Sequence, residues 1–175
     1  HSGGSATNLV VIKFDSAGTL QWPTFYGSGG SAGYNEGRGI AVDDSDNVYV
    51  TGYSSGTWGA PLHPHSGNLD VTVTKLDSAG TYQWHTFYGS TGADDGRSIA
   101  VDSSGNLHVA GASSASWGAP LDPIGGPAGN ADIMVLKLAG DAAPDPDPDP
   151  FAFVDAIGVP VSTQQYSNSI TVAGI

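Results

Sequence analysis

The chain has 175 residues, among them 26 glycines, and only 13% of its residues are charged. This composition disfavours helices and suits short strands joined by tight turns. Five basic residues against 17 acidic ones give a net charge of −12, which excludes a nucleic-acid-binding surface built on clustered lysine and arginine.

The sequence also lacks two features, cysteine and long apolar segments. There is no cysteine, so neither a disulfide framework nor a thiolate metal site is expected. Apolar runs all fall short of the roughly 20 residues that a membrane-spanning helix needs, so we expect no membrane insertion.

The chain opens with a predicted hairpin. Residues 8–14 form a β-rich run, residues 15–18 read Asp-Ser-Ala-Gly, and residues 20–26 form a second run. An aspartate at the start of such a turn accepts backbone N–H bonds, and a glycine near its end takes a positive φ. The hairpin recurs at residues 70–88, and its first strand recurs once more at residues 131–138.

A second pair of strands follows each hairpin. Residues 37–43 and 48–52 read as strand, turn and strand, and residues 96–102 and 107–111 repeat the pattern. We expect this pair to supply the packed faces through its apolar members: Ile40, Val42, Val48, Val50, Ile99, Val101, Leu107 and Val109.

Four strands per unit, repeated about every 60 residues, predict an all-β fold of four-stranded antiparallel β-propeller blades. Residues 1–139 hold about two and a quarter such blades, which is too few to close a ring of about four to eight. The matching of residues 1–3 to residues 65–67 leads us to expect another blade before this one.

The basic residues follow the repeat. Three lysines are evenly spaced along the chain, and Arg38 and Arg97 occupy equivalent positions in the two Gly-Arg strands, which favours a structural role over a binding patch. We expect the cations to pair with turn aspartates, and we expect Asp94 or Asp95 to pair with Arg38 or Arg97. The lysines should lie on the third strand of each blade: Lys13, Lys75 and Lys137.

The second copy of the hairpin and of the Gly-Arg strand pair resembles a known family. The run Lys-Leu-Asp-Ser-Ala-Gly-Thr-Tyr-Gln-Trp-His-Thr-Phe-Tyr-Gly, followed by Asp-Asp-Gly-Arg-Ser-Ile-Ala-Val-Asp-Ser-Ser-Gly-Asn-Leu-His-Val-Ala-Gly, is similar to the bacterial β-propeller repeats called SBBP repeats. The resemblance covers about residues 1–139. It implies a multi-bladed propeller in a large secreted or surface-displayed bacterial protein, and it implies no shared enzymatic activity.

The rest of the chain has a different character. Residues 140–150 include alternating proline and aspartate, which predicts an extended interdomain linker, with a calcium-binding acidic tract as the alternative. Residues 151–175 resume β character and look like the start of an immunoglobulin-like module. They are too few to fold alone, so a strand donated to a neighbour is the other interpretation.

The sequence suggests two kinds of metal site as hypotheses. Asp44 and Asp46 alternate with other oxygen-bearing residues in a turn, a pattern that loosely resembles a calcium loop. The equivalent turn at residues 102–106 lacks those carboxylates, which favours a turn-forming role. His63 and His65 offer two imidazoles, although neither recurs in the second long loop. No other cofactor is expected.

The tryptophans recur in pairs. Trp22 and Trp84 lie in equivalent strands, and packing between blades explains them. Trp58 and Trp117 lie in the long loops at residues 54–68 and 113–130, which we expect to pack on themselves. An exposed indole in such a loop could also stack on a sugar.

Repetition without a unique polar cluster favours a non-catalytic, secreted or cell-surface structural or adhesive protein. Self-association through exposed strand edges would make it a subunit of an extracellular filament. A lectin-like propeller that uses Trp58 and Trp117 to bind surface glycans is the first alternative. The second is a fragment of a propeller enzyme, although no Gly-x-Ser-x-Gly motif or isolated pair of acids supports catalysis.

Overall fold

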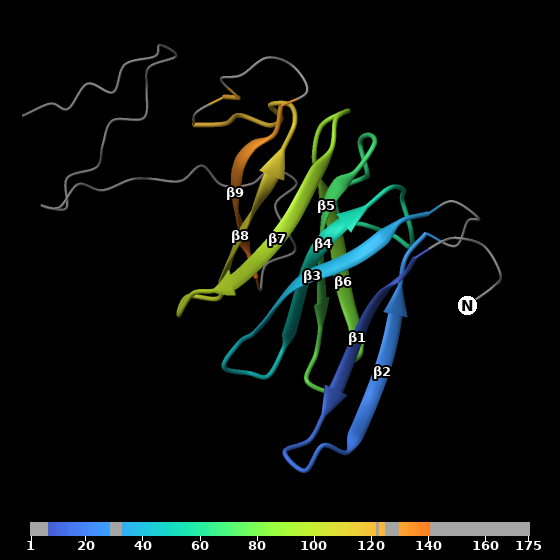
Figure 1. Ribbon diagram of the computed structural model, residues 1–175. Coiled ribbons are helices and arrows are strands. Elements are labelled where there is room, and N and C mark those ends of the chain that lie inside the picture. The colour runs from blue at the N-terminus through green and yellow to red at the C-terminus, as the bar shows by residue number, and fades with distance from the viewer. Residues whose placement is uncertain (1–6, 29–32, 122, 125–129, 141–175) are drawn as a thin grey trace, which may run out of the picture.

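The computed structural model describes residues 7–28, 33–121, 123–124 and 130–140, and every regular element within them is a β-strand (Figure 1). The strands are β1 (Leu9–Phe14), β2 (Leu20–Tyr26), β3 (Asn35–Val42), β4 (Val48–Ser54), β5 (Asp70–Leu76), β6 (Tyr82–Tyr88), β7 (Asp94–Val101), β8 (Asn106–Ser113) and β9 (Asp132–Ala139). The predicted all-β class is confirmed.

The described strands form three antiparallel sheets in the orders β1-β2, β3-β4-β5-β6 and β7-β8-β9. The middle sheet is a complete four-stranded blade whose consecutive strands are neighbours. Lys75 lies on its third strand, as predicted, and Lys137 lies on the third strand of the last sheet. By the same equivalence β1 and β2 are the third and fourth strands of a preceding blade, and Lys13 lies on β1.

The hydrophobic core lies between the sheets, which follow one another from blue to orange in Figure 1. One cluster joins the first two sheets through Leu9, Val11, Val48, Val50 and Leu76. A larger cluster joins the last two sheets, and its buried members are Tyr49, Val71, Val73, Tyr88, Ile99, Leu107, Val109, Met134, Leu136 and Leu138. Trp22 and Trp84 pack against the first and the second cluster respectively, which agrees with the packing role predicted for them.

The predicted core needs one correction. Ile40 and Val42 are 60% and 55% exposed, whereas Ile99, which is equivalent to Ile40, is 7% exposed. Ile99 on β7 packs against the middle sheet. The first sheet contains β1 and β2 alone, so none of the described residues covers Ile40 in the same way. Burial at this position therefore depends on the neighbouring blade and not on the strand itself.

The first strand of each blade contains a bulge at its arginine. The β3–β4 register shifts between Gly37 and Gly39, and the β7–β8 register shifts between Gly96 and Ser98, so Arg38 and Arg97 are the extra residues. A bulge bends the strand and redirects the side chain that it carries.

On the strand opposite each bulge, there is no room for a side chain. A Cβ added at Gly52 would lie 1.7 Å from the Glu36 carbonyl oxygen, and one at Gly111 would lie 1.9 Å from that of Asp95. This close approach explains why both second strands carry glycine there.

Of the two predicted C-terminal segments, only the first residue of the linker is described. Gly140, the first residue of the predicted linker, follows β9 directly, is buried, and donates its N–H to the Gly105 carbonyl at 3.0 Å. The rest of the linker, residues 141–150, and the predicted β segment at 151–175 lie outside the described residues.

Candidate functional site

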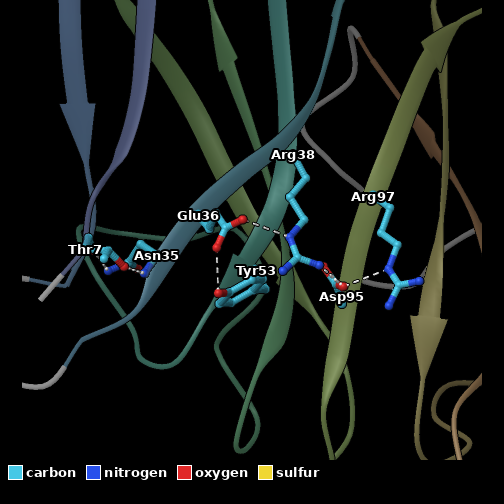
Figure 2. Close-up of polar contacts among 7 residues, drawn as sticks. All are labelled: Thr7, Asn35, Glu36, Arg38, Tyr53, Asp95 and Arg97. Carbon is cyan, nitrogen blue, oxygen red and sulfur yellow. Dashed lines mark hydrogen bonds and ion pairs between the residues drawn. The ribbon is translucent and has the colours of Figure 1, made fainter.

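A network of ion pairs lies on the first strands of two consecutive blades (Figure 2). We call Glu36, Arg38, Asp95 and Arg97 the interblade ladder. The Arg38 guanidinium donates to Glu36 Oε1 at 3.2 Å and also to Asp95 Oδ2 on the next blade. Arg97 donates to the same Asp95 oxygen at 2.9 Å. Acidic and arginine side chains therefore alternate along the ladder, which continues from one blade to the next.

Tyr53 on β4 supports the ladder from the neighbouring strand. Its hydroxyl donates to Glu36 Oε2 at 2.8 Å, and its ring lies 4.8 Å from the Arg38 guanidinium carbon, within cation–π range. The hydrogen bond from Tyr53 lowers the pKa of Glu36, with a further contribution from Arg38. The same hydrogen bond raises the pKa of Tyr53.

The pKa of Arg38 is raised as well. Partial burial disfavours its charged form, but the negative charges of Asp95 and Glu36 outweigh that effect. These contacts shift the pKa values of Glu36, Arg38 and Tyr53 away from neutrality, so Glu36 stays deprotonated and Arg38 and Tyr53 stay protonated at neutral pH. Proton transfer needs a group poised between two states, and these contacts favour a fixed charge instead.

The predicted pairing of the arginines with Asp94 or Asp95 is confirmed for Asp95 and not for Asp94. Asp95 does pair with Arg38 and Arg97. Asp94 is buried and accepts hydrogen bonds from neutral donors. Two lysines donate to backbone carbonyl oxygens of the next blade: Lys13 Nζ to Ser78 O at 3.0 Å and Lys75 Nζ to Gly140 O at 3.2 Å.

The aspartates that begin the turns organise them, as predicted. Asp15, Asp43, Asp77 and Asp102 each accept backbone N–H bonds from the residues two and four positions later, at 2.8 to 3.0 Å. The fourth position of each turn has a positive φ, and it is glycine in three turns and Asp46 in the other. Asp46 therefore occupies a backbone position that the equivalent turns give to glycine.

The calcium hypothesis for Asp44 and Asp46 stays a prediction. Both side chains are exposed at the tip of the turn, and the carboxylate that faces into the turn is that of Asp43. Within the described residues no group of three or more histidine, cysteine, aspartate or glutamate side chains is placed to hold a metal ion. His63 and His65 each contact a backbone carbonyl through a ring nitrogen, of Pro64 and Ser54 respectively.

Trp58 packs between two blades. Its ring stacks on His85 of β6, with centroids 3.5 Å apart and planes 6° apart, and lies 5.8 Å from Tyr26 of the first sheet. His85 Nε2 donates to the Trp58 carbonyl at 2.8 Å, which leaves Nδ1 to accept from the Tyr82 hydroxyl at 2.7 Å. Burial lowers the pKa of His85 to about 4, although the Trp58 carbonyl opposes that shift. The imidazole is neutral at physiological pH.

Trp117 repeats this arrangement in part. It stacks on Tyr88, with centroids 6.1 Å apart, as Trp58 stacks on Tyr26. Its Nε1 donates to Asp94 Oδ1 at 3.0 Å. Both long loops thus pack against the strands of neighbouring blades and not merely on themselves. Interblade packing accounts for the recurrence of both tryptophans, and sugar stacking stays a prediction.

Sequence reasoning missed Tyr53, His85 and the buried role of Asp94. The signal for Asp94 was available, because its counterpart in the preceding repeat is Asn35, a residue that cannot form an ion pair. No such signal existed for His85, since the equivalent position holds Pro23.

The described residues include no helix that is long and apolar enough to span a membrane.

A comparison with protein families matches the chain at two places. The model described as beta-propeller repeat, SBBP, matches residues 26–57 and 83–116. Each match begins at or within the last strand of one sheet and continues through the first two strands of the next. The repeat unit of the family thus crosses a blade junction, where the interblade ladder and the stacked tryptophans lie. A search of curated proteins finds no match to this chain.

Proposed function

We propose that this chain, which carries SBBP beta-propeller repeats, is a non-catalytic structural module that associates head to tail with further copies of itself. In this proposal it works outside the cell, as a secreted or surface-displayed fibre or adhesive component. One observation carries the proposal. Residue positions that are buried between neighbouring sheets in the middle of the described chain are exposed on the first and last described sheets.

The upstream face is formed by Val10, Ile12 and Phe14 on β1, which are 47%, 48% and 57% exposed. The equivalent residues of β5, Thr72, Thr74 and Leu76, are at most 1% exposed. Those of β9 are also buried, at 2% to 8%: Met134, Leu136 and Leu138. The same face of the third strand is therefore covered twice within the chain and left open once.

The downstream face is formed by Ile133 and Val135 on β9, which are 88% and 56% exposed. Their counterparts Val71 and Val73 are fully buried, and Leu9 and Val11 nearly so. The two open faces are opposite sides of the repeating sheet, and they meet each other inside the molecule. Contact between copies through such unlike faces is heterologous, which produces a ring or an open filament.

The test uses one charged variant for each face. Ile133→Asp/Val135→Asp should abolish assembly, measured by light scattering coupled to size exclusion across a range of concentrations and by electron microscopy. Val10→Asp/Ile12→Asp should do the same from the other face. Leu62→Asp, a loop substitution at a side chain that is 41% exposed, is the matched control and should assemble normally.

Mixing the two face variants is the sharper part of the experiment. Each retains one intact face, so a head-to-tail contact predicts heterodimers that cannot grow longer. An isologous contact predicts no heterodimer from that mixture. A wild-type chain that stays monomeric at the highest attainable concentration would overturn the proposal.

Glycan binding is the second candidate, and one observation favours it at Trp117. Trp58 has His85 on its ring, whereas the last sheet has no fourth strand among the described residues to supply an equivalent imidazole. Trp117 is half-buried, and its stacking partner is Tyr88. A glycan array should then show hits that Trp117→Ala removes and Trp58→Ala retains; an array without hits excludes this function.

A further inference from the structure

Two fully buried carboxylates lie at the junction between the middle and last sheets. Asp70 is the first residue of β5 and Asp94 is the first residue of β7, and both have no exposed surface. Neither contacts an arginine or lysine among the described ion pairs. Burying a carboxylate is costly unless a counter-charge or a full set of hydrogen bonds compensates it.

Hydrogen bonds satisfy three of the four carboxylate oxygens. Asp70 Oδ2 accepts from the backbone N–H and the hydroxyl of Ser66, at 2.6 and 2.9 Å. Asp94 Oδ2 accepts the same pair of bonds from Ser90, at 2.7 and 3.0 Å, and its Oδ1 accepts from Ser113 and Trp117. Asp70 Oδ1 is buried and has no hydrogen-bond partner.

The unpartnered oxygen lies close to the other carboxylate. A Cβ added at Gly89 would meet Asp70 Oδ1 and Asp94 Oδ2, each at 2.7 Å. The two oxygens are therefore no farther apart than twice that distance, beside a backbone position where any side chain would clash with them. Two acceptors of like charge share this space, which we call the Gly89 pocket.

The equivalent pocket one blade earlier contains different chemistry. A Cβ at Gly27 would meet Asn8 Oδ1 at 2.6 Å and Asn35 Nδ2 at 2.7 Å. Asn8 and Asn35 are the counterparts of Asp70 and Asp94 in the preceding repeat. The earlier junction thus places a neutral acceptor beside a neutral donor, and the later junction places two carboxylates in the same positions.

We propose that Asp70 and Asp94 bind one calcium ion at the Gly89 pocket and so join the middle blade to the next one. A divalent cation neutralises both carboxylates and supplies the partner that Asp70 Oδ1 lacks. Calcium is favoured because it takes oxygen ligands in flexible geometry, and the two groups nearest the Gly89 position are carboxylates. This site is separate from the turn that contains Asp44 and Asp46.

The affinity should be modest. Calcium takes six to eight oxygens, and two carboxylates supply a minority of them, so hydroxyl, carbonyl or water oxygens must complete the set. Sites with few charged ligands in extracellular modules have dissociation constants of about 10⁻⁴ to 10⁻³ M. Binding in this range responds to millimolar calcium.

The first measurement is thermal unfolding of the intact chain with calcium and with chelator at pH 7. Calcium at about 1 mM should raise the wild-type melting temperature by about 1–6 °C, because a ligand that binds only the folded state stabilises it by mass action. The variant Asp70→Asn/Asp94→Asn should show no response. It reproduces the asparagine pair of the Gly27 junction, so it is expected to fold.

A spectroscopic measurement locates the ion. Terbium replaces calcium at oxygen sites and emits when a nearby excited indole transfers energy to it. Trp117 hydrogen-bonds to Asp94, so terbium at the Gly89 pocket should give emission on tryptophan excitation. Added calcium should displace terbium and reduce this emission. The variant Asp70→Asn/Asp94→Asn should show no emission, whereas Asp44→Asn/Asp46→Asn should show the wild-type emission.

Three outcomes would overturn the site. A wild-type melting temperature indifferent to calcium, together with no terbium emission, would exclude binding. Stabilisation by acid alone would show that the two carboxylates share a proton instead of a cation. A calcium response lost in Asp44→Asn/Asp46→Asn and kept in Asp70→Asn/Asp94→Asn would assign the ion to the turn.

Discussion

Arg38 on β3 binds the carboxylate of Asp95 on β7, although the two residues are 57 positions apart in the chain. The contact joins the first strand of one blade to the first strand of the next. The bulge at Arg38 directs its side chain toward this contact, and the Tyr53 ring packs against its guanidinium. The bulge on one first strand thus places an arginine against an acid of the next first strand, and this contact holds the two blades together.

Arg38→Ala should destabilise the chain by about 1–2 kcal/mol, because it removes a partly buried, charge-assisted pair between blades. Urea denaturation measures the change. Arg97→Ala is the matched control, since Arg97 is 63% exposed and contacts Asp95 alone among the ladder carboxylates. Its loss should cost less than about 0.5 kcal/mol. Equal losses in the two variants would contradict the interblade role of Arg38.

Gly52→Ala should prevent the first and second strands from pairing at the bulge. The added Cβ would lie 1.7 Å from the Glu36 carbonyl, so the strands must separate, with a loss of more than about 3 kcal/mol. Circular dichroism during heating measures it. Gly18→Ala is the control, because its φ is +81° but no atom lies within 4 Å of its Cβ position. That change should cost only about 1 kcal/mol.

Stability should fall as the pH decreases from 6.5 to 4 because of His85. Its pKa is about 4 in the folded chain and 6.5 in an unfolded one, so the unfolded state binds more protons across this window. The stabilisation from the neutral imidazole is fully present above pH 6.5 and is lost progressively below it. The loss should reach about 2–3 kcal/mol near pH 4 and then level off.

The contribution of His85 is isolated by subtraction. His85→Gln keeps a donor for the Trp58 carbonyl and an acceptor for Tyr82, but it does not titrate. The difference between wild-type and variant unfolding free energies should therefore slope between pH 4 and 6.5 and be flat outside that range. A flat difference throughout would show that His85 is not desolvated as described.

Asp46→Gly should stabilise the chain slightly. Asp46 has a φ of +63°, whereas glycine occupies the same turn position at residues 18, 80 and 105. Relief of the left-handed backbone exceeds the extra flexibility that glycine gives the unfolded chain, so chemical denaturation should show a gain of about 0.5 kcal/mol. The reverse exchange, Gly105→Asp, should destabilise by a similar amount. A large loss in Asp46→Gly would indicate a role for its carboxylate, such as the calcium ligation suggested by the sequence.

The strands and turns could be predicted from the sequence because their causes are local. Aspartate at the start of a turn and a residue with positive φ at its fourth position recur four times, and each turn contains its own hydrogen bonds. The regular spacing of the repeats then placed the lysines on equivalent strands. Those features need no knowledge of which sheet lies beside which.

The tertiary structure alone decided which faces are covered and which polar groups meet. Ile40 and Ile99 have nearly the same local sequence but differ in exposure, because a neighbouring sheet covers only the second. Asp94 and Asp95 are adjacent in sequence, yet one enters a buried pocket with Asp70 and the other the interblade ladder. Burial and electrostatic pairing depend on contacts between residues far apart in the chain, which a repeat pattern along the sequence does not specify.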